Sequence, residues 1–152
     1  ESLGDITLEN NIISIQIALE ALSYIILVEK EGLLDDEQFD QNNASKNIKL
    51  VLNACNIPHG SDELELFDDW IRGKFDDGVD LVIYFRNKIV HPVRKDNRAN
   101  LTVEDMWNII QIGTKYIELI VLSFIGYKGE YSNRLKERWF GEVEVVPWNK
   151  LD

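Results

Sequence analysis

Cysteine is nearly absent from this sequence. Cys55 is the only one in 152 residues, so no disulfide can form within the chain and a thiolate metal cluster is excluded. A single free cysteine is typical of the reducing cytosol, and we expect a cytoplasmic protein. Because no basic residue stands beside Cys55 in the sequence, we expect a buried, unreactive thiol rather than a nucleophile.

Histidine is also scarce, with His59 and His91 as the two examples. The sequence contains no cluster of His, Cys and Asp at metal-ligand spacing, and we expect neither a metal ion nor another cofactor. His59 lies in a Pro-His-Gly turn, where the sequence offers it no obvious partner. Any catalytic chemistry therefore has to work without a metal.

Basic residues are fewer than acidic ones. Lys and Arg number 16 against 27 Asp and Glu, giving a net charge of −11, which argues against general nucleic-acid binding. The charge is unevenly distributed, because residues 72–98 hold 7 basic against 4 acidic residues, whereas residues 1–71 hold 3 against 15. A solvated helix face explains such a basic segment about as well as a binding site does.

No apolar run is long and uncharged enough for a convincing membrane span. The longest, residues 12–28, contains Gln16 and Glu20 near its middle, so we expect a buried helix and no membrane partner. Glu20 has two interpretations of about equal weight. It reaches Arg86 or His91 and orients it, or it points to solvent from an amphipathic helix.

The length and the 45% apolar content predict one domain, residues 1–152. We expect an all-α fold: a bundle of four to five helices with an extended C-terminal tail. The single methionine, Met106, and the start at Glu1 lead us to expect a longer parent protein with other domains. The predicted helices cover 7–31, 45–56, 61–74, 78 to the proline at position 92, 102–125 and a short stretch at 132–138, before a strand-like tail at 141–148.

The fourth predicted helix ends in the sequence YFRNKIVHPVR, residues 84–94. Asn87 and His91 are four residues apart, so on a helix they share one face, and the long side chain of Arg86 can reach either of them. Pro92 forbids continuation of the helix and places His91 at its end. A histidine can change charge near neutral pH, as acid-base catalysis requires.

Arginine and histidine together suit one reaction that needs no metal. RNA strand cleavage by its own 2′-hydroxyl requires proton transfers and a cation that stabilises charge on phosphorus. Arg86 can supply the cation and His91 the proton transfer. Without further support, however, a simpler interpretation wins, in which Arg86 and Asn87 brace a helix end and His91 is an ordinary histidine at a proline turn.

The motif resembles a known family. The sequence from Arg86 to His91 is similar to the R-N-x-x-x-H form of the RX4-6H motif of HEPN domains, the higher eukaryotes and prokaryotes nucleotide-binding domains of toxin-antitoxin and anti-phage systems. The stretch from Phe124 to Trp148, FIGYKGEYSNRLKERWFGEVEVVPW, resembles the C-terminal end of the ApeA-like HEPN group, and IALEALS at 17–23 fits its first helix. This resemblance implies that the bundle is antiparallel, with an up-down order of its helices. It also implies a metal-independent endoribonuclease in which Arg86 and His91 are catalytic and Asn87 supports them.

The resemblance also implies partners. It predicts RNA as the substrate and a homodimer whose two motifs face each other, so that each protomer contributes one His91 to a composite site. Lys88 and Arg94 flank the motif and are the stronger candidates for RNA-phosphate contacts, and Arg98 is the weaker one. HEPN domains also include members that only bind, so a non-catalytic nucleotide- or RNA-binding module and a dimerising scaffold of a larger defence protein stay open.

The four tryptophans could stack on RNA bases, but we expect most of them in the core. We expect only Trp148, in the tail, to be free for another role. The other three tryptophans are at positions 70, 107 and 139.

Overall fold

The computed structural model describes residues 3–91, 101–136 and 141–149, and the described chain is mostly helical, as the sequence predicts. A small two-stranded sheet and two 3-10 helices complete it. The elements in chain order are α1 (Leu3–Tyr24), the π-helical turn η1 (Ile25–Lys30), α2 (Asp36–Gln41), α3 (Ala44–Ala54), the 3-10 helix η2 (Ser61–Leu66), α4 (Asp69–Lys74), α5 (Gly78–Val90), α6 (Val103–Phe124), β1 (Glu130–Tyr131), β2 (Glu144–Val145) and the 3-10 helix η3 (Pro147–Asn149).

Side-chain caps fix where several helices begin. Thr102 accepts a hydrogen bond from the backbone N–H of Asp105, whose carboxylate accepts from Thr102 in return, and this capping box confirms the predicted start of α6. Asp35 and Gln38 form a second capping box. It creates α2 inside an acidic stretch where the sequence predicted only a connection.

The predicted helix over 61–74 is wrong. The chain forms η2 and then α4, because Asp68 stands between them in extended conformation and its side chain accepts from the N–H of Ile71. A capping aspartate starts a new helix and so interrupts the old one. The predicted short helix at 132–138 is not formed over 132–136, and residues 137 and 138 lie outside the described residues.

The C-terminal segment forms a hairpin-like arm. Glu130 pairs with Val145 and Tyr131 with Glu144 in an antiparallel ladder, so the strand-like alternation of the tail is confirmed over two residues. Trp148 is not free, because its indole N–H donates to the backbone oxygen of Tyr127 at 2.7 Å and its ring packs against the core. The arm is therefore tied to the end of α6.

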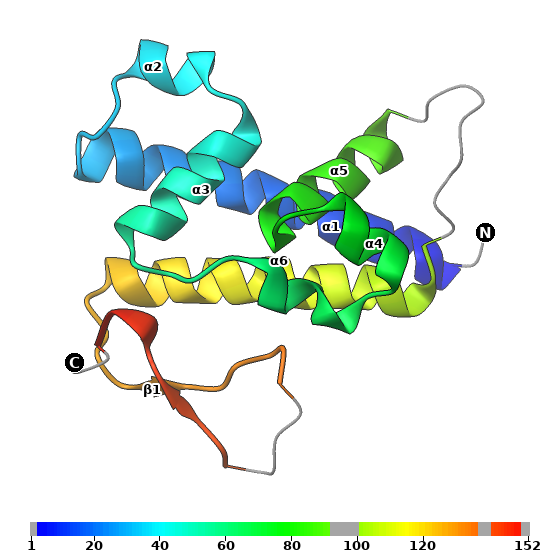
Figure 1. Cartoon of the computed structure of the whole chain (residues 1–152). Coiled ribbons are helices and arrows are strands. Elements are labelled where there is room, and N and C mark those ends of the chain that lie inside the picture. The colour runs from blue at the N-terminus through cyan, green and yellow to red at the C-terminus, as the bar shows by residue number, and fades with distance from the viewer. Residues whose placement is uncertain (1–2, 92–100, 137–140, 150–152) are drawn as a thin grey trace.

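The core is built around α1, which packs against α3, α5 and α6. Its closest neighbour is α6. At Gly113 a Cβ would lie 2.3 Å from Cγ2 of Ile15, so the two helices approach closely only because residue 113 has no side chain. In Figure 1, α1 and α6 run in the same direction and α5 runs back, so the strict up-down order predicted from the sequence is not confirmed.

One helical stretch, Thr7–Lys30, is long and apolar enough to cross a membrane by length and composition. The core helix of a soluble protein passes the same test, and the α1 part of this stretch contributes the fully buried Ile12 and Leu19. Its length and composition are therefore weak evidence for a membrane span.

Candidate functional site

The motif lies at the C-terminal end of α5. The helix ends at Val90, and His91 follows as its C-cap with φ −118° and ψ 75°, outside helical geometry, while its N–H still donates to the backbone oxygen of Asn87 at 2.8 Å. The sequence predicted this termination before Pro92, which itself lies outside the described residues. The imidazole of His91 is exposed at the end of the helix.

Arg86 and Asn87 are brought together. The Arg86 guanidinium donates through Nη1 to the Asn87 side-chain oxygen at 3.1 Å, so the fork of the arginine reaches the face that carries Asn87. Its Nε is buried and has no hydrogen-bond partner among the described residues. Buried polar groups without partners are rare in folded proteins and are often found where a ligand or a reacting group completes the set.

His91 shares a face with Asn87 through their spacing of one helical turn. Within the described part of the chain the structure records no side-chain hydrogen bond between His91 and either Arg86 or Asn87. The structure therefore joins two of the three motif side chains directly and leaves the imidazole open to solvent.

Three further residues were predicted to support the motif or to contact RNA phosphates: Glu20, Lys88 and Arg94. Glu20 is partly buried and accepts a hydrogen bond from Gln16, one turn earlier on α1. The described residues show no hydrogen bond or ion pair from Glu20 to the motif, so its predicted contact with Arg86 or His91 is not found among them. Lys88 lies over the ring of Tyr84, 5.4 Å from its centroid, on the same helix as the motif. Arg94, the other predicted phosphate contact, lies outside the described residues.

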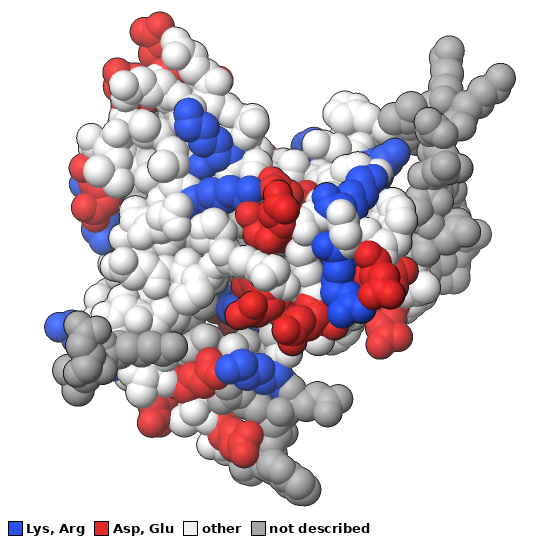
Figure 2. All heavy atoms as spheres, viewed as in Figure 1, with Lys and Arg blue, Asp and Glu red and all other residues white. Residues whose placement is uncertain are grey.

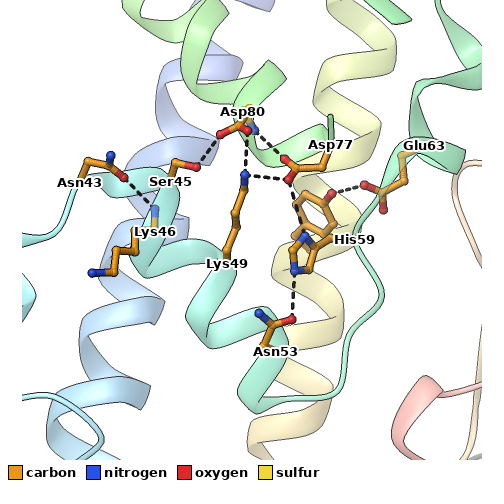
Figure 3. Close-up of polar contacts among 10 residues, drawn as sticks. Asn43, Ser45, Lys46, Lys49, Asn53, His59, Glu63, Asp77 and Asp80 are labelled. Atoms are coloured by element: carbon orange, nitrogen blue, oxygen red, sulfur yellow. Dashed lines mark hydrogen bonds and ion pairs between the residues drawn. The ribbon is translucent and has the colours of Figure 1, made fainter. Parts of the chain in front are cut away.

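A polar cluster occupies the other end of α5 (Figure 3). Lys49 of α3 donates to Asp77, the N-cap of α5, and to Asp80, both at 2.7 Å. Burial alone would lower the pKa of Lys49, but its hydrogen bonds to both carboxylates outweigh burial and raise it. Burial would raise the pKa of Asp80, and hydrogen bonds from Lys49 and Ser45 outweigh it and lower the pKa.

His59 belongs to this cluster and has a partner there that was not obvious from the sequence. Its Nε2 is 3.1 Å from the side-chain oxygen of Asn53, and its Nδ1 faces Asp77 at 3.9 Å, too far for a hydrogen bond. The turn at 58–60 brings the His59 ring back over α3. Because this contact does not follow helical spacing, the sequence pattern could not predict it.

A buried ion pair lies beside the cluster. Lys115 of α6 donates to Glu63 of η2 at 2.7 Å, and both residues are at least nine-tenths buried. The Tyr116 hydroxyl donates to the second oxygen of Glu63. Burial, together with the negative charge of Glu63, raises the pKa of Tyr116 well above its usual value. Because Glu63 is fully engaged, this group is best explained as a clamp between η2 and α6.

Gly78 allows the clamp to form against α5. A Cβ at this position would lie 2.7 Å from Ile112 and 2.8 Å from both Glu63 and the Tyr116 hydroxyl. Any larger residue would push the first turn of α5 away from α6. The position therefore helps to orient the whole helix that carries the motif at its far end.

Two pockets lie away from the motif. One, of about 600 Å³, is lined by α6 and the segment 131–134. The other, of about 480 Å³, lies between the turn at 58–63, α6 and the C-terminal arm, and its wall includes both residues of the buried Glu63–Lys115 pair. Neither is lined by a residue of α5. Among the described residues, no group of three or more His, Cys, Asp and Glu side chains could hold a metal ion.

The predicted burial is wrong for two tryptophans and confirmed for the cysteine. Trp70 is 48% exposed and Trp107 is 54% exposed, so neither is a core residue, contrary to the expectation from the sequence. Trp139 lies outside the described residues. Cys55 is buried, as expected, and burial raises the pKa of its thiol.

These features define a helical domain with a polar motif at the exposed end of one helix. Residues 1–145 match the model of the YopA C-terminal domain, and the chain belongs to that family. It is 35% identical over 146 residues to the SPbeta prophage-derived uncharacterized protein YopA of Bacillus subtilis (strain 168). The alignment covers 95% of this chain and 32% of that relative, so the chain spans about a third of the relative's length. No solved structure matches the chain.

Proposed function

We propose that this domain is a metal-independent endoribonuclease of the HEPN type, in a prokaryotic defence or toxin-type protein. The observation that carries the proposal is the end of α5. There the Arg86 guanidinium donates to Asn87 while its buried Nε is unpaired, and Asn87 lies one turn of helix before the exposed His91. A cation braced by a neutral amide keeps its full charge for a phosphate, which a carboxylate partner would neutralise.

The proposed chemistry is transesterification within RNA. The 2′-hydroxyl loses its proton and its oxygen attacks the adjacent phosphorus, the bond from phosphorus to the 5′-oxygen breaks, and the leaving oxygen gains a proton. Arg86 stabilises the charge that develops on the phosphoryl oxygens, His91 transfers protons, and Asn87 holds the guanidinium in place. The products are a 2′,3′-cyclic phosphate and a free 5′-hydroxyl.

A homodimer completes the proposed site. Cleavage needs a general base and a general acid, and each chain offers one exposed histidine at the motif, so two protomers with facing α5 ends supply both. As the finer description of the fold, we propose a bundle of the four longest helices, α1, α3, α5 and α6, with the C-terminal arm packed at the end of α6. No cofactor takes part, and RNA, a second copy of the chain and other domains of a parent protein are the proposed partners.

A second function has its own support. The net charge of −11 repels RNA, and Val121, Phe124 and Ile125 are exposed at the C-terminal end of α6, where a protein partner could cover them. These features favour a non-catalytic nucleotide- or RNA-binding or dimerising module of a larger defence protein. In that case the motif residues bind or brace without reacting.

One cleavage assay separates the two functions. Structured RNA is incubated with wild type, His91→Ala or Arg86→Gln in excess EDTA, and His59→Gln serves as the matched histidine control. The endoribonuclease predicts cleavage by wild type and the control and its loss in both motif variants. Equal cleavage by His91→Ala and wild type contradicts the assignment, and RNA binding without cleavage favours the module.

A further inference from the structure

A cluster of two rings and two lysines lies beside the motif, with Trp70 and Lys74 exposed and Tyr84 and Lys88 half-buried. Trp70 and Lys74 come from α4, and Tyr84 and Lys88 from α5. The Lys74 ammonium lies 4.6 Å from the Trp70 ring centroid and 4.1 Å from that of Tyr84, and it donates to the Tyr84 hydroxyl at 2.8 Å. Figure 2 shows Lys and Arg side chains gathered over α4 and α5, on the face turned to the viewer. Lys74 therefore joins two helices through aromatic contacts.

The two lysines differ from most cations of the described chain. Six others pair with carboxylates within 4 Å, namely Lys30, Lys49, Arg72, Lys115, Arg134 and Lys136. Within the described residues Lys74 and Lys88 have no carboxylate partner and lie over rings instead. A ring attracts a cation without cancelling its charge. Both lysines thus keep their charge for an anion, in a protein that is acidic as a whole.

The nearest carboxylates in sequence have other roles. Asp69 pairs with Arg72, and Asp68 caps α4. Asp76 is exposed, but it precedes α5, at the opposite end of that helix from Lys88. The acidic residues of α4 therefore do not neutralise the lysines beside Trp70.

The register of α5 connects this cluster to the motif. Tyr84, Lys88 and His91 stand at positions i, i+4 and i+7, which form one stripe along a helix. A rise of 1.5 Å per residue places His91 about 10 Å along the axis from Tyr84. A ligand that follows the stripe from α4 meets Lys88 and then His91.

An exposed ring beside unneutralised cations matches the chemistry of a single-stranded nucleic acid. Such a strand offers free base faces for stacking and phosphates for lysines, whereas a duplex hides its base faces. We propose that Trp70, Lys74, Tyr84 and Lys88 form a single-stranded RNA surface that delivers its strand to the motif at the end of α5. Its role as a substrate path rests on the proposed endoribonuclease function.

In this surface Trp70, 48% exposed, provides the stacking ring. Lys74 and Lys88 contact phosphates, and Tyr84 holds both ammonium groups in place through its ring and hydroxyl. The contacts involve base faces and phosphates rather than base edges, so the surface prefers single strands over duplexes and shows little sequence preference.

Binding is measured in the His91→Ala background, so that the RNA stays intact. A labelled single-stranded oligonucleotide and its duplex are titrated by fluorescence anisotropy, and circular dichroism checks that each variant is folded. Trp70→Ala is expected to weaken single-strand binding by about tenfold. The control Trp107→Ala removes a tryptophan of similar exposure from α6 and leaves binding unchanged.

The lysines are tested through the salt dependence of binding. The double variant Lys74→Gln/Lys88→Gln is expected to reduce the slope of log affinity against log salt by about 1.4, about 0.7 for each lost phosphate contact with a single strand. The control variant Lys46→Gln/Lys128→Gln removes the same charge at two exposed lysines outside the surface. It is expected to leave the slope of log affinity against log salt unchanged. The His91→Ala protein with the surface intact is expected to bind the duplex more weakly than the single strand.

The outcomes separate this inference from the proposed function. If Trp70→Ala and the double lysine variant bind single strands as well as their controls do, the surface is refuted. If they lose self-association by light scattering and keep RNA affinity, the surface is a protein interface and the inference is also overturned. If wild type does not cleave RNA, but Trp70→Ala loses RNA affinity while the Trp107→Ala control keeps it, the RNA surface is supported and the endoribonuclease function is refuted.

Discussion

Replacing Lys115 by methionine should lower the free energy of unfolding by about 3 kcal/mol, because it leaves the Glu63 carboxylate buried without its cation. Glu63 is 6% exposed and Lys115 is 9% exposed, so water can replace only a small part of the lost interaction. The Tyr116 hydroxyl still donates to Glu63, which keeps the loss at the lower end of the range of about 3 to 5 kcal/mol for broken buried pairs. In a chain of this length the melting temperature falls by about 6 to 12 °C.

Urea unfolding followed by circular dichroism at 222 nm measures this loss. In the double variant Glu63→Gln/Lys115→Met no buried charge remains and the glutamine still accepts from Tyr116, so most of the stability is expected to return. Arg134→Gln is the control, because its pair with Glu118 is more than a third exposed on both sides and is expected to contribute less than about 1 kcal/mol. Equal losses in Lys115→Met and Arg134→Gln, or strictly additive effects in the double variant, would refute the buried clamp.

Three further predictions concern the fold. Gly113→Ala should lower the free energy of unfolding by about 1 to 3 kcal/mol through its collision with α1, whereas Gly73→Ala, with open space around its Cβ, should be neutral or stabilising in the same urea assay. The pKa of Asp80 is lower in the folded than in the unfolded protein, so its ionised carboxylate stabilises the fold above the ordinary carboxyl pKa of about 3.9. This stabilisation is lost as the pH falls through the folded-state pKa. Lys49→Met should reduce that loss of stability in unfolding curves measured from pH 6 to pH 2. Cys55 should not react with a thiol reagent in the folded protein and should react fully in denaturant, and rapid reaction when folded would contradict its burial.

Local signals in the sequence predicted much of the helical structure. The end of α5 before a proline and the capping box at Thr102 depend on residues within four positions, and both are found. The split of the predicted helix at 61–74 was missed, because Asp68 lies inside the predicted range and caps a new helix there. Capping and helix-interior aspartates look the same in a single sequence.

Contacts between distant segments could not be predicted in the same way. Glu63 and Lys115 are 52 residues apart, and no periodicity connects η2 to α6. The exposure of Trp70 was missed for a related reason. An aromatic residue at helical spacing is usually assigned to the core, and the sequence did not show that its helix has only 6 residues. For the motif, the sequence predicted that Arg86 could reach Asn87, and the structure contains that hydrogen bond.

The most direct test of the central claim is the chemistry of the cleaved ends. Wild-type protein in excess EDTA is incubated with an RNA oligonucleotide and with the same oligonucleotide carrying a 2′-deoxy sugar at the cleaved position, and products are identified by mass spectrometry. The account predicts a 2′,3′-cyclic phosphate and a 5′-hydroxyl from the first substrate, no cleavage at the modified position of the second, and no products with His91→Ala. Cleavage at the 2′-deoxy position, unchanged cleavage by His91→Ala, or an intact RNA that the wild type binds without cutting would each contradict it.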